Sequence, residues 1–280
     1  MARINQISIE KLMAGYSVLL LDAYGVLVHT SDALPGAVQL IDTLNRNQKP
    51  YYILTNDASK LPATCAERFQ GFGLTIAPDR IITSGSLLTD YFARHQLRDL
   101  PCAVLGPEDS VRYVELAGGK VVSAQNPFEV LVIGDESGYP FLETIDTVLS
   151  GLFSRLDSAG NVHLVLPNPD LIYPKSEQGF GIASGCIALI LEAALQRRYP
   201  GRPELKFVRL GKPHAAIFQE ALERSGTMDM VMIGDQLETD IRGAVEFGLD
   251  AALVGTGIAN IKPDEVDRSL QPTYYLDSLN

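Results

Sequence analysis

Carboxylate, hydroxyl and ammonium side chains follow apolar runs at four places in this chain. Asp22 follows the run VLLL, and Asp235 follows VMIG. Thr55 and Asn56 follow YYIL, and Lys212 follows FVRLG. An aspartate can attack phosphorus to form an aspartyl phosphate, and two carboxylates suit an octahedral oxygen-binding ion such as Mg²⁺. A Thr hydroxyl and a Lys ammonium would hold the phosphoryl oxygens and neutralise their charge, so together these residues could carry out phosphoryl transfer.

Taken singly, each of these residues has an ordinary explanation. Asp or Asn after a strand is most often a turn residue or a helix cap. Thr239 and Asp240 would serve as an N-cap and as a favourable charge at a helix start. A lone lysine such as Lys212 is usually a solvated surface side chain. The four places indicate a site only if they fall together at one edge of one sheet, because open α/β sheets bind ligands outside the carboxyl ends of their strands.

Short apolar runs alternate with helical patterns along the chain, which predicts βαβ units and an α/β, doubly wound parallel sheet. The predicted strands are residues 18–21, 51–54, 230–233 and 251–254, and the predicted helices are residues 36–48, 61–71, 214–225 and 239–248. The middle of the chain repeats this alternation with enough strands for a second, smaller α/β sheet. We therefore predict a discontinuous core domain of residues 1–87 and 181–280, and a second domain of residues 88–180.

Composition and charge exclude several classes of protein. The chain has 280 residues, of which 46% are hydrophobic, so a disordered protein is excluded. The net charge of −11 argues against a nucleic-acid partner, and an anionic substrate would need local positive charge or a metal. No apolar run approaches the roughly 20 residues of a membrane span, and the first residues lack the layout of a signal peptide. Three scattered cysteines indicate free thiols, so we expect a cytoplasmic protein with no membrane partner.

The four places resemble, in order, the four motifs of the haloacid dehalogenase superfamily of phosphotransferases. DAYGV, which begins at Asp22, resembles the nucleophile loop, and LTND at residues 54–57 resembles the second motif. GKPH at 211–214 resembles the third and GDQLETD at 234–240 the fourth. The long insert before the third motif, with LPNPDLIYP at 166–174, is similar to the type IIA group with its α/β cap domain, the NagD-like and 4-nitrophenylphosphatase-like proteins. The resemblance extends over nearly the whole chain.

This resemblance implies a role for the residues that carry it. Asp22 would be the nucleophile, and Asp22, Asp235 and the backbone carbonyl of Tyr24 would bind Mg²⁺. Asp240 would orient the residues around the metal. The implied activity is a phosphohydrolase with an aspartyl-phosphate intermediate.

The resemblance also implies a small phosphorylated metabolite as substrate. Thr55, Asn56 and Lys212 would bind its phosphoryl group, while Asn168 and Asp170 would belong to a substrate-facing loop of the cap. Nothing in that loop selects a sugar, a nucleotide or an organic acid. The oligomeric state, with a homodimer through the cap as one option, is left open because no residue pattern argues for it.

Tyr24 stands where phosphatases of this family usually carry a second Asp, which protonates the leaving oxygen and then deprotonates the attacking water. A tyrosine with an ordinary pKa near 10 can donate a proton at neutral pH but is a poor base. Loss of a positioned acid and base costs roughly 10²–10⁴ in rate, so we predict a slow enzyme.

Three alternatives follow from the same residues. The chain could be a catalytically weakened member that binds a phosphorylated ligand as a regulator or partner-binding module. It could transfer the phosphoryl group to an acceptor other than water. A dehalogenase is disfavoured, because that chemistry needs no metal and would leave the fourth motif without a purpose.

Overall fold

The structure is a computed structural model that describes residues 5–29, 31–176, 179–255 and 271–279. It divides into two compact units. The first, the core unit, comprises Met1–Thr55, Pro62–Thr83 and Lys212–Asn280. The second, the cap unit, comprises Asn56–Leu61 and Ser84–Gly211.

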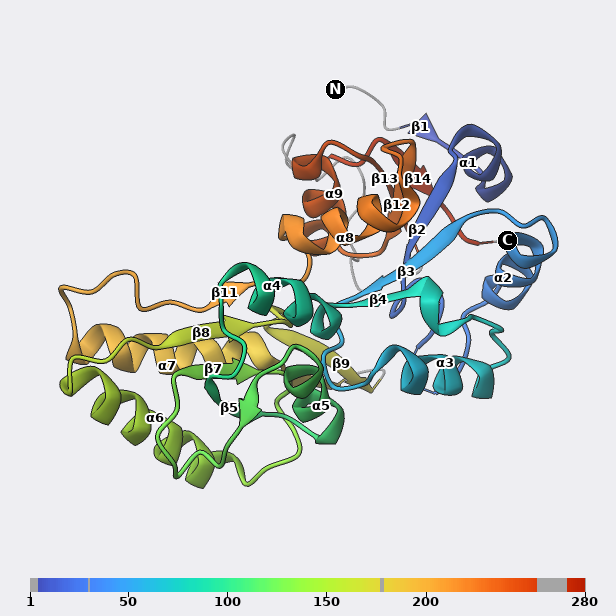
Figure 1. Cartoon of the computed structure of the whole chain (residues 1–280). Coiled ribbons are helices and arrows are strands. Elements are labelled where there is room, and N and C mark those ends of the chain that lie inside the picture. Colours follow the sequence, from blue (N-terminus) through green and yellow to red (C-terminus); the bar gives the residue numbers. More distant parts are fainter. Residues whose placement is uncertain (1–4, 30, 177–178, 256–270, 280) are drawn as a thin grey trace. The chain divides into compact units, whose positions relative to one another are not determined.

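The described strands of the core unit form a seven-stranded sheet in the order β1-β14-β13-β12-β2-β3-β4, and every pair in it is parallel (Figure 1). These strands are β1 Asn5–Gln6, β2 Val18–Asp22, β3 Tyr51–Thr55, β4 Ile81–Thr83, β12 Met230–Gly234, β13 Asp250–Val254 and β14 Tyr274–Leu276. All five residues of β2 and all five of β12 are buried. Their sequences are continuous apolar runs because a parallel sheet covered by helices buries side chains on both faces.

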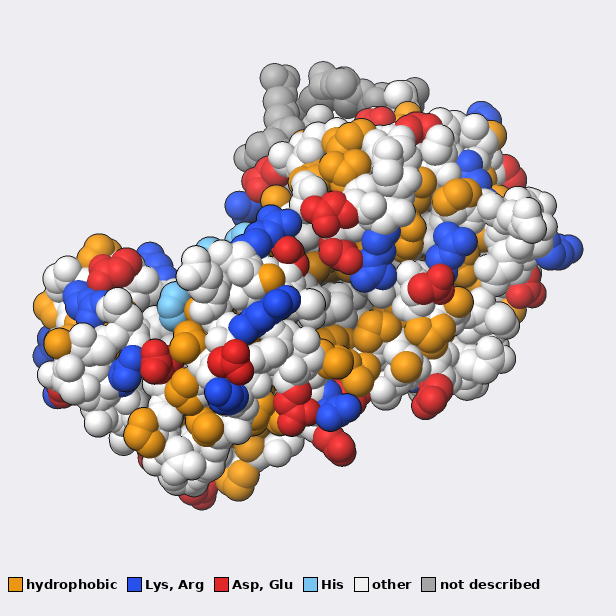
Figure 2. Space-filling model, viewed as in Figure 1, with side chains coloured by type: hydrophobic (Ala, Val, Ile, Leu, Met, Phe, Trp, Pro, Cys, Tyr) orange, Lys and Arg blue, Asp and Glu red, His pale blue; other side chains and the backbone are white. Residues whose placement is uncertain are grey.

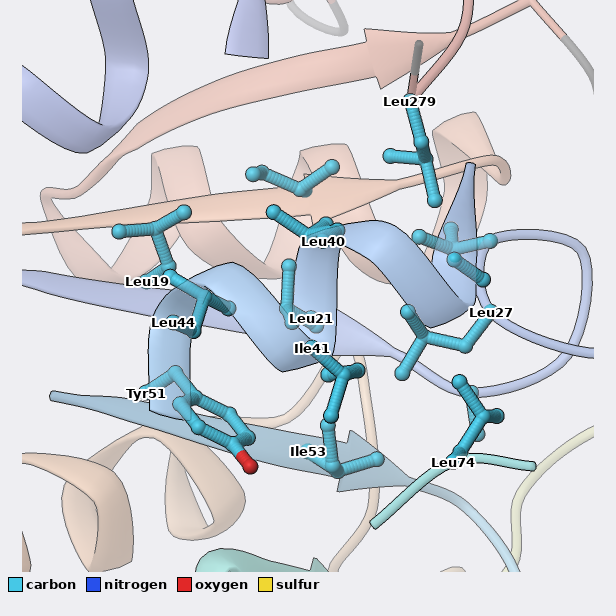
Figure 3. Packing of buried hydrophobic residues seen from close by; sticks show 14 of the residues in the cluster. Leu19, Leu21, Leu27, Leu40, Ile41, Leu44, Tyr51, Ile53, Leu74 and Leu279 are labelled. Atoms are coloured by element: carbon cyan, nitrogen blue, oxygen red, sulfur yellow. The ribbon is translucent and has the colours of Figure 1, made fainter. Parts of the chain in front are cut away.

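Helices cover both faces of this sheet. They are α1 Ile9–Gly15, α2 Ala37–Arg46, α3 Pro62–Gly71, α8 Ala215–Ser225 and α9 Arg242–Phe247, with the short turns η1 Pro78–Arg80 and η3 Leu237–Ile241. In Figure 3, α2 lies across one face, and Leu40 and Ile41 of its apolar side pack with Leu21 of β2. Helical segments from the C-terminal part of the chain lie behind the sheet in the same view. The doubly wound arrangement predicted from the sequence is therefore confirmed.

The cap unit has its own parallel sheet in the order β11-β8-β7-β5-β6, together with an antiparallel β9–β10 hairpin. Its strands are β5 Pro101–Leu105, β6 Lys120–Val121, β7 Val130–Ile133, β8 His163–Leu166, β9 Ile172–Ser176, β10 Gly179–Ile182 and β11 Val208–Arg209. Its helices are η2 Ser84–Leu87, α4 Leu88–Arg94, α5 Glu108–Leu116, α6 Phe141–Asp157 and α7 Ser184–Arg198.

The cap unit is larger than the 88–180 predicted from the sequence. Ile187 and Leu191 of α7 belong to the same buried cluster as Leu131 of β7, and β11 pairs with β8. These contacts bring the chain as far as Gly211 into the cap unit.

The composition led to expectations about the cysteines and about membrane-spanning segments. Cys65, Cys102 and Cys186 are free thiols, as predicted. Within the described residues, no helix combines the length and the apolar character that a membrane crossing needs.

Candidate active site

The carboxyl ends of three neighbouring strands bring the predicted residues of the core unit to one edge of its sheet. Asp22 ends β2, Thr55 ends β3, and Asp235 directly follows β12. The strands lie in the order β12-β2-β3 with parallel register. In an open α/β sheet this edge is where ligands bind.

Asp22, Asp235 and Asp240 form a buried carboxylate cluster at this edge. One oxygen from each side chain lies within 4.8 Å of the others. Asp22 is 5% exposed, and Asp235 and Asp240 are fully buried. Buried carboxylates are costly unless cations compensate their charge, so the cluster needs positive partners.

Lys212 supplies one of these positive charges. Its Nζ lies 2.6 Å from Asp22 Oδ1 and 2.7 Å from Asp240 Oδ1, and the residue is only 3% exposed. The sequence predicted a phosphate-binding lysine here, and the structure adds that this lysine joins two of the three carboxylates. The cluster thus holds three carboxyl groups beside one ammonium, an excess of acidic groups that a divalent cation would help to balance.

Burial and neighbouring charges shift the pKa values of Lys212 and Asp22 in different directions. Burial alone lowers the pKa of Lys212, but the Asp22 and Asp240 carboxylates outweigh it and hold that pKa above the ordinary lysine value. Burial, and then the Asp240 charge, raise the pKa of Asp22 well above its usual range, although Lys212 opposes this. The nucleophile must be a carboxylate anion, so further positive charge at the cluster would favour its reactive form.

Asp240 is held in place by the loop that follows β12. Its Oδ2 accepts hydrogen bonds from the backbone N–H of Asp235 at 3.2 Å and of Gln236 at 3.1 Å. A Cβ at Gly234 would lie only 2.2 Å from the Asp240 Cβ, so glycine is required for this approach. Both oxygens of Asp240 are engaged, Oδ1 by Lys212 Nζ and Oδ2 by these N–H groups, so Asp22 and Asp235 are the better candidates to hold a cation.

The loop after β2 approaches Asp235 through a glycine. Gly25 has φ +86°, and a Cβ there would lie 2.2 Å from Asp235 Oδ2. The turn is closed by Leu27 and Val28, whose N–H groups both donate to the Ala23 carbonyl at 2.9 Å. Gly25 was not among the residues predicted from the sequence, although a glycine three residues after the strand-ending Asp22 is a recognisable pattern.

The donor set fits a hard divalent cation such as Mg²⁺. Such an ion takes oxygen ligands and is usually bound by one or two carboxylates plus substrate oxygens. Asp22 and Asp235 supply two carboxylates within reach of each other, in a cluster that holds three carboxyl groups.

Tyr24 is used for packing in the core unit. Its ring is half-buried against the cluster that α1, α2 and α3 build on the sheet. The Arg68 guanidinium lies over the ring, with Cζ 5.5 Å from the centroid, and also 5.6 Å from the Phe72 ring centroid. Nothing in the sequence linked Arg68 to Tyr24. These contacts fix where the ring lies, while its proton-donating role stays a prediction.

The remaining predicted residues fall on both sides of the unit boundary. Thr55 is buried at the end of β3 in the core unit, and Asn56 begins the cap unit. Asn56 Nδ2 donates to Asp170 Oδ1 at 2.8 Å, and Asn168 Oδ1 accepts from the Asp170 N–H at 3.0 Å. A Cβ at Gly211 would lie 2.5 Å from Asn56 Oδ1. The cap unit therefore gathers Asn56, Asn168 and Asp170 into one hydrogen-bonded group.

Comparison with known proteins gives consistent matches. A family model described as haloacid dehalogenase-like hydrolase matches residues 19–120, and a HAD-hydrolase-like model matches residues 209–280. The dihydroxyacetone phosphatase of Corynebacterium glutamicum is 30% identical over 263 residues, which cover 93% of this chain and 88% of that protein.

Two solved structures have the same fold. A possible sugar phosphatase from Cytophaga hutchinsonii superposes with a TM-score of 0.84 at 29% identity and covers 99% of both chains. A glycerol phosphate phosphatase from Mycobacterium tuberculosis, crystallised with magnesium, has a TM-score of 0.81 at 22% identity, covering 98% of this chain and 78% of that one.

Proposed function

Because this chain belongs to the haloacid dehalogenase-like hydrolases and is a type IIA phosphatase of small phosphorylated substrates, we propose that it works through an aspartyl phosphate on Asp22. The observation that carries this proposal is the buried cluster in which Asp22 Oδ1 lies 2.6 Å from Lys212 Nζ. A nucleophilic carboxylate beside a fixed ammonium and two further carboxylates suits phosphoryl transfer, which asks mainly for positioning and charge compensation.

Each residue then has a defined task. Asp22, Asp235 and the backbone carbonyl of Tyr24 would hold Mg²⁺, which when bound supplies positive charge against the phosphoryl oxygens. Lys212 and the Thr55 hydroxyl bind the phosphoryl group. The Asp22 carboxylate attacks phosphorus, the bond between phosphorus and the ester oxygen breaks, and the leaving oxygen takes a proton from solvent water. Water then cleaves the acyl phosphate, which restores the carboxylate and releases inorganic phosphate.

The substrate class we propose is a small sugar phosphate or triose phosphate. This rests on the dihydroxyacetone phosphatase and the possible sugar phosphatase to which the chain is similar. Asn168 and Asp170 are the proposed substrate contacts in the cap unit, because they are polar and their hydrogen bonds with each other and Asn56 order them in advance.

The test uses the full-length protein with Mg²⁺ and a panel of dihydroxyacetone phosphate, glucose 6-phosphate, 4-nitrophenyl phosphate and acetyl phosphate. Phosphate release and intact mass are followed for wild type, Asp22→Asn and a control, Asp42→Asn, whose side chain is exposed on α2. We expect Asp22→Asn to lose activity at least about 10³-fold and to show no phosphorylated mass. Equal phosphate release by wild type and Asp22→Asn would rule out the nucleophile.

A second candidate function is a binding module for a phosphorylated ligand. The observation in its favour is Tyr24, whose ring packs on the core cluster beneath Arg68 at the position of the usual acid and base. Mg²⁺ binding without turnover of any member of the panel would favour this reading over the enzyme.

A further inference from the structure

A pocket of about 670 Å³ lies in the core unit at the amino ends of the strands, the opposite end of the sheet from Asp22. Its lining includes Val18 at the start of β2, Tyr52 near the start of β3, and Arg80 of η1, just before β4. The C-terminal end of α8 closes it with Arg224. At about 3.3 Å per residue, the length of β2 separates this pocket from the nucleophile by roughly 13 Å. The volume is that of a small-metabolite site.

The Arg80 side chain is held in place but keeps most of its hydrogen-bond donors. Its Cζ lies 5.4 Å from the Tyr51 ring centroid and 5.8 Å from the Tyr52 centroid. Its Nη1 donates to the Tyr51 carbonyl at 3.3 Å, and across the described part of the chain this is the one hydrogen bond or ion pair of the guanidinium. An arginine has five such N–H donors, so several are left for a ligand.

A second guanidinium is anchored at the same pocket. Arg224 Nε lies 2.7 Å from Glu220 Oε1, and its Nη1 donates to the Asp79 carbonyl at 3.2 Å. Tyr52 in turn donates its hydroxyl to the Arg224 carbonyl at 3.1 Å. These bonds tie α8 to η1 and β3, so the walls of the pocket are in place before any ligand arrives.

We propose that this pocket binds the phosphate group of a small metabolite, or inorganic phosphate, with Arg80 as the principal donor. A guanidinium presents a planar fork that matches phosphate oxygens, and its stacking on two tyrosines reduces the entropy lost on binding. Arg224 adds a second positive charge, which Glu220 partly offsets.

Negative groups nearby limit the affinity. The Asp79 carboxylate lines the pocket and is exposed, and the C-terminal end of α8 carries partial negative charge. Figure 2 shows Lys and Arg side chains interleaved with Asp and Glu on the face over β3 and β4. Binding depends on the attraction between phosphate and the local arginines, so it should weaken as rising salt concentration screens that attraction.

The experiment titrates the full-length protein with inorganic phosphate and, separately, with AMP by calorimetry in EDTA. EDTA withdraws the divalent cation that the carboxylate cluster would need to bind a phosphate group, so the signal reports the pocket beside Arg80. We expect one binding site in wild type, weakened at least about tenfold in Arg80→Gln because a charged hydrogen-bonding group is lost. Arg80→Lys keeps the positive charge but loses the planar guanidinium, so its affinity for phosphate should lie between those of wild type and Arg80→Gln.

Two further variants make the test specific. Asp79→Asn removes a like charge and should tighten phosphate binding by about threefold. Arg242 is an exposed arginine of α9 that pairs with Glu246, so the Arg242→Gln variant should bind phosphate as tightly as wild type does. Tighter binding of AMP than of phosphate would mean that the pocket takes a nucleotide, and equal binding that it recognises the phosphate group alone.

Several results would overturn the proposal. These are no binding of either probe at about 10 mM, equal binding by wild type and by an Arg80→Gln variant with an unchanged circular dichroism spectrum, or weaker binding in Asp79→Asn. The last result would mean that the pocket takes a cation.

Discussion

Lys212 Nζ lies 2.6 Å from Asp22 Oδ1, with the two side chains only 3% and 8% exposed. The lysine thus compensates the proposed nucleophile directly, and it also bridges to Asp240 at 2.7 Å. The same ammonium is the group we propose to neutralise the transferred phosphoryl oxygens, so it links the stability of the site to its activity.

Replacing Lys212 should lower both the stability of the protein and its phosphatase activity. We expect Lys212→Met to lower kcat/KM by about 10²–10³ and, in EDTA, to lower the free energy of unfolding by about 3 kcal/mol, because buried carboxylates lose their partner. The pKa of Lys212 is raised above its ordinary 10.5, so the stabilisation is fully present below that value and is lost only as the pH rises through the raised pKa. Urea unfolding of both proteins should therefore give a difference in the free energy of unfolding that does not shrink from pH 6 to pH 9.

Exposed Lys11 is the control for this measurement, since Lys11→Met should unfold as wild type does. A difference between wild type and Lys212→Met that already shrinks below pH 9 would contradict the ion-pair account.

The Asp235→Asn substitution should raise thermal stability without metal and reduce the stabilisation that Mg²⁺ provides. In EDTA, Asp235→Asn removes one of three crowded carboxylates and should raise the melting temperature. In wild type, Mg²⁺ at 100 times its Kd should stabilise the fold by about 2.7 kcal/mol, and the variant should lose most of this gain. Thermal unfolding with and without Mg²⁺ measures both effects. Undiminished Mg²⁺ stabilisation of Asp235→Asn would remove this residue from the metal site.

Two glycines in the left-handed region separate backbone strain from the site itself. A Cβ at Gly25 would lie 2.2 Å from Asp235 Oδ2, whereas Gly226, with φ +70°, has no atom within 4 Å of such a Cβ. Both alanine variants should lose about 1–2 kcal/mol to the unfavourable φ. Only Gly25→Ala should also lose Mg²⁺ stabilisation and phosphatase activity, because the Asp235 carboxylate must move. If Gly226→Ala loses activity equally, strain alone explains the effect.

Tyr24 can be tested with a pair of substitutions. If its ring only packs beneath Arg68, Tyr24→Phe should leave turnover of every substrate within about twofold. Tyr24→Asp restores the acid and base that the family usually has, and should speed hydrolysis of alkyl phosphates by up to about 10². Hydrolysis of acetyl phosphate, whose leaving group needs no proton, should be accelerated much less by the same substitution. Steady-state kinetics on both substrates decide this, and a tenfold loss in Tyr24→Phe would instead assign the hydroxyl a catalytic role.

Much of the core unit could be predicted because the sequence patterns that indicate its strands and helices are local. The apolar runs ending at Asp22 and Asp235 predicted buried parallel strands, and the order of strands and helices predicted a doubly wound sheet. A polar residue directly after such a strand must lie at the carboxyl edge, so the position of the site followed from the pattern.

The extent of the cap unit was less predictable. Its last strand is the two-residue β11, Val208–Arg209, which is too short to produce a pattern, and it is recognised only by its pairing with β8. Apolar residues lie all round α7, where Ile187 and Leu191 are buried while Leu189 and Ile190 are exposed, so its sequence does not say which sheet the helix covers.

By itself, the sequence determined the fold class, the sheet edge that carries the site and the chemical types of the residues there. Only the tertiary structure decided that Lys212 joins Asp22 to Asp240, that Gly25 lets the loop reach Asp235, and that Arg68 covers Tyr24. Asp22 and Lys212 are 190 residues apart in the chain. Their contact depends on how strands and loops pack in three dimensions, and local sequence patterns carry no information about such distances.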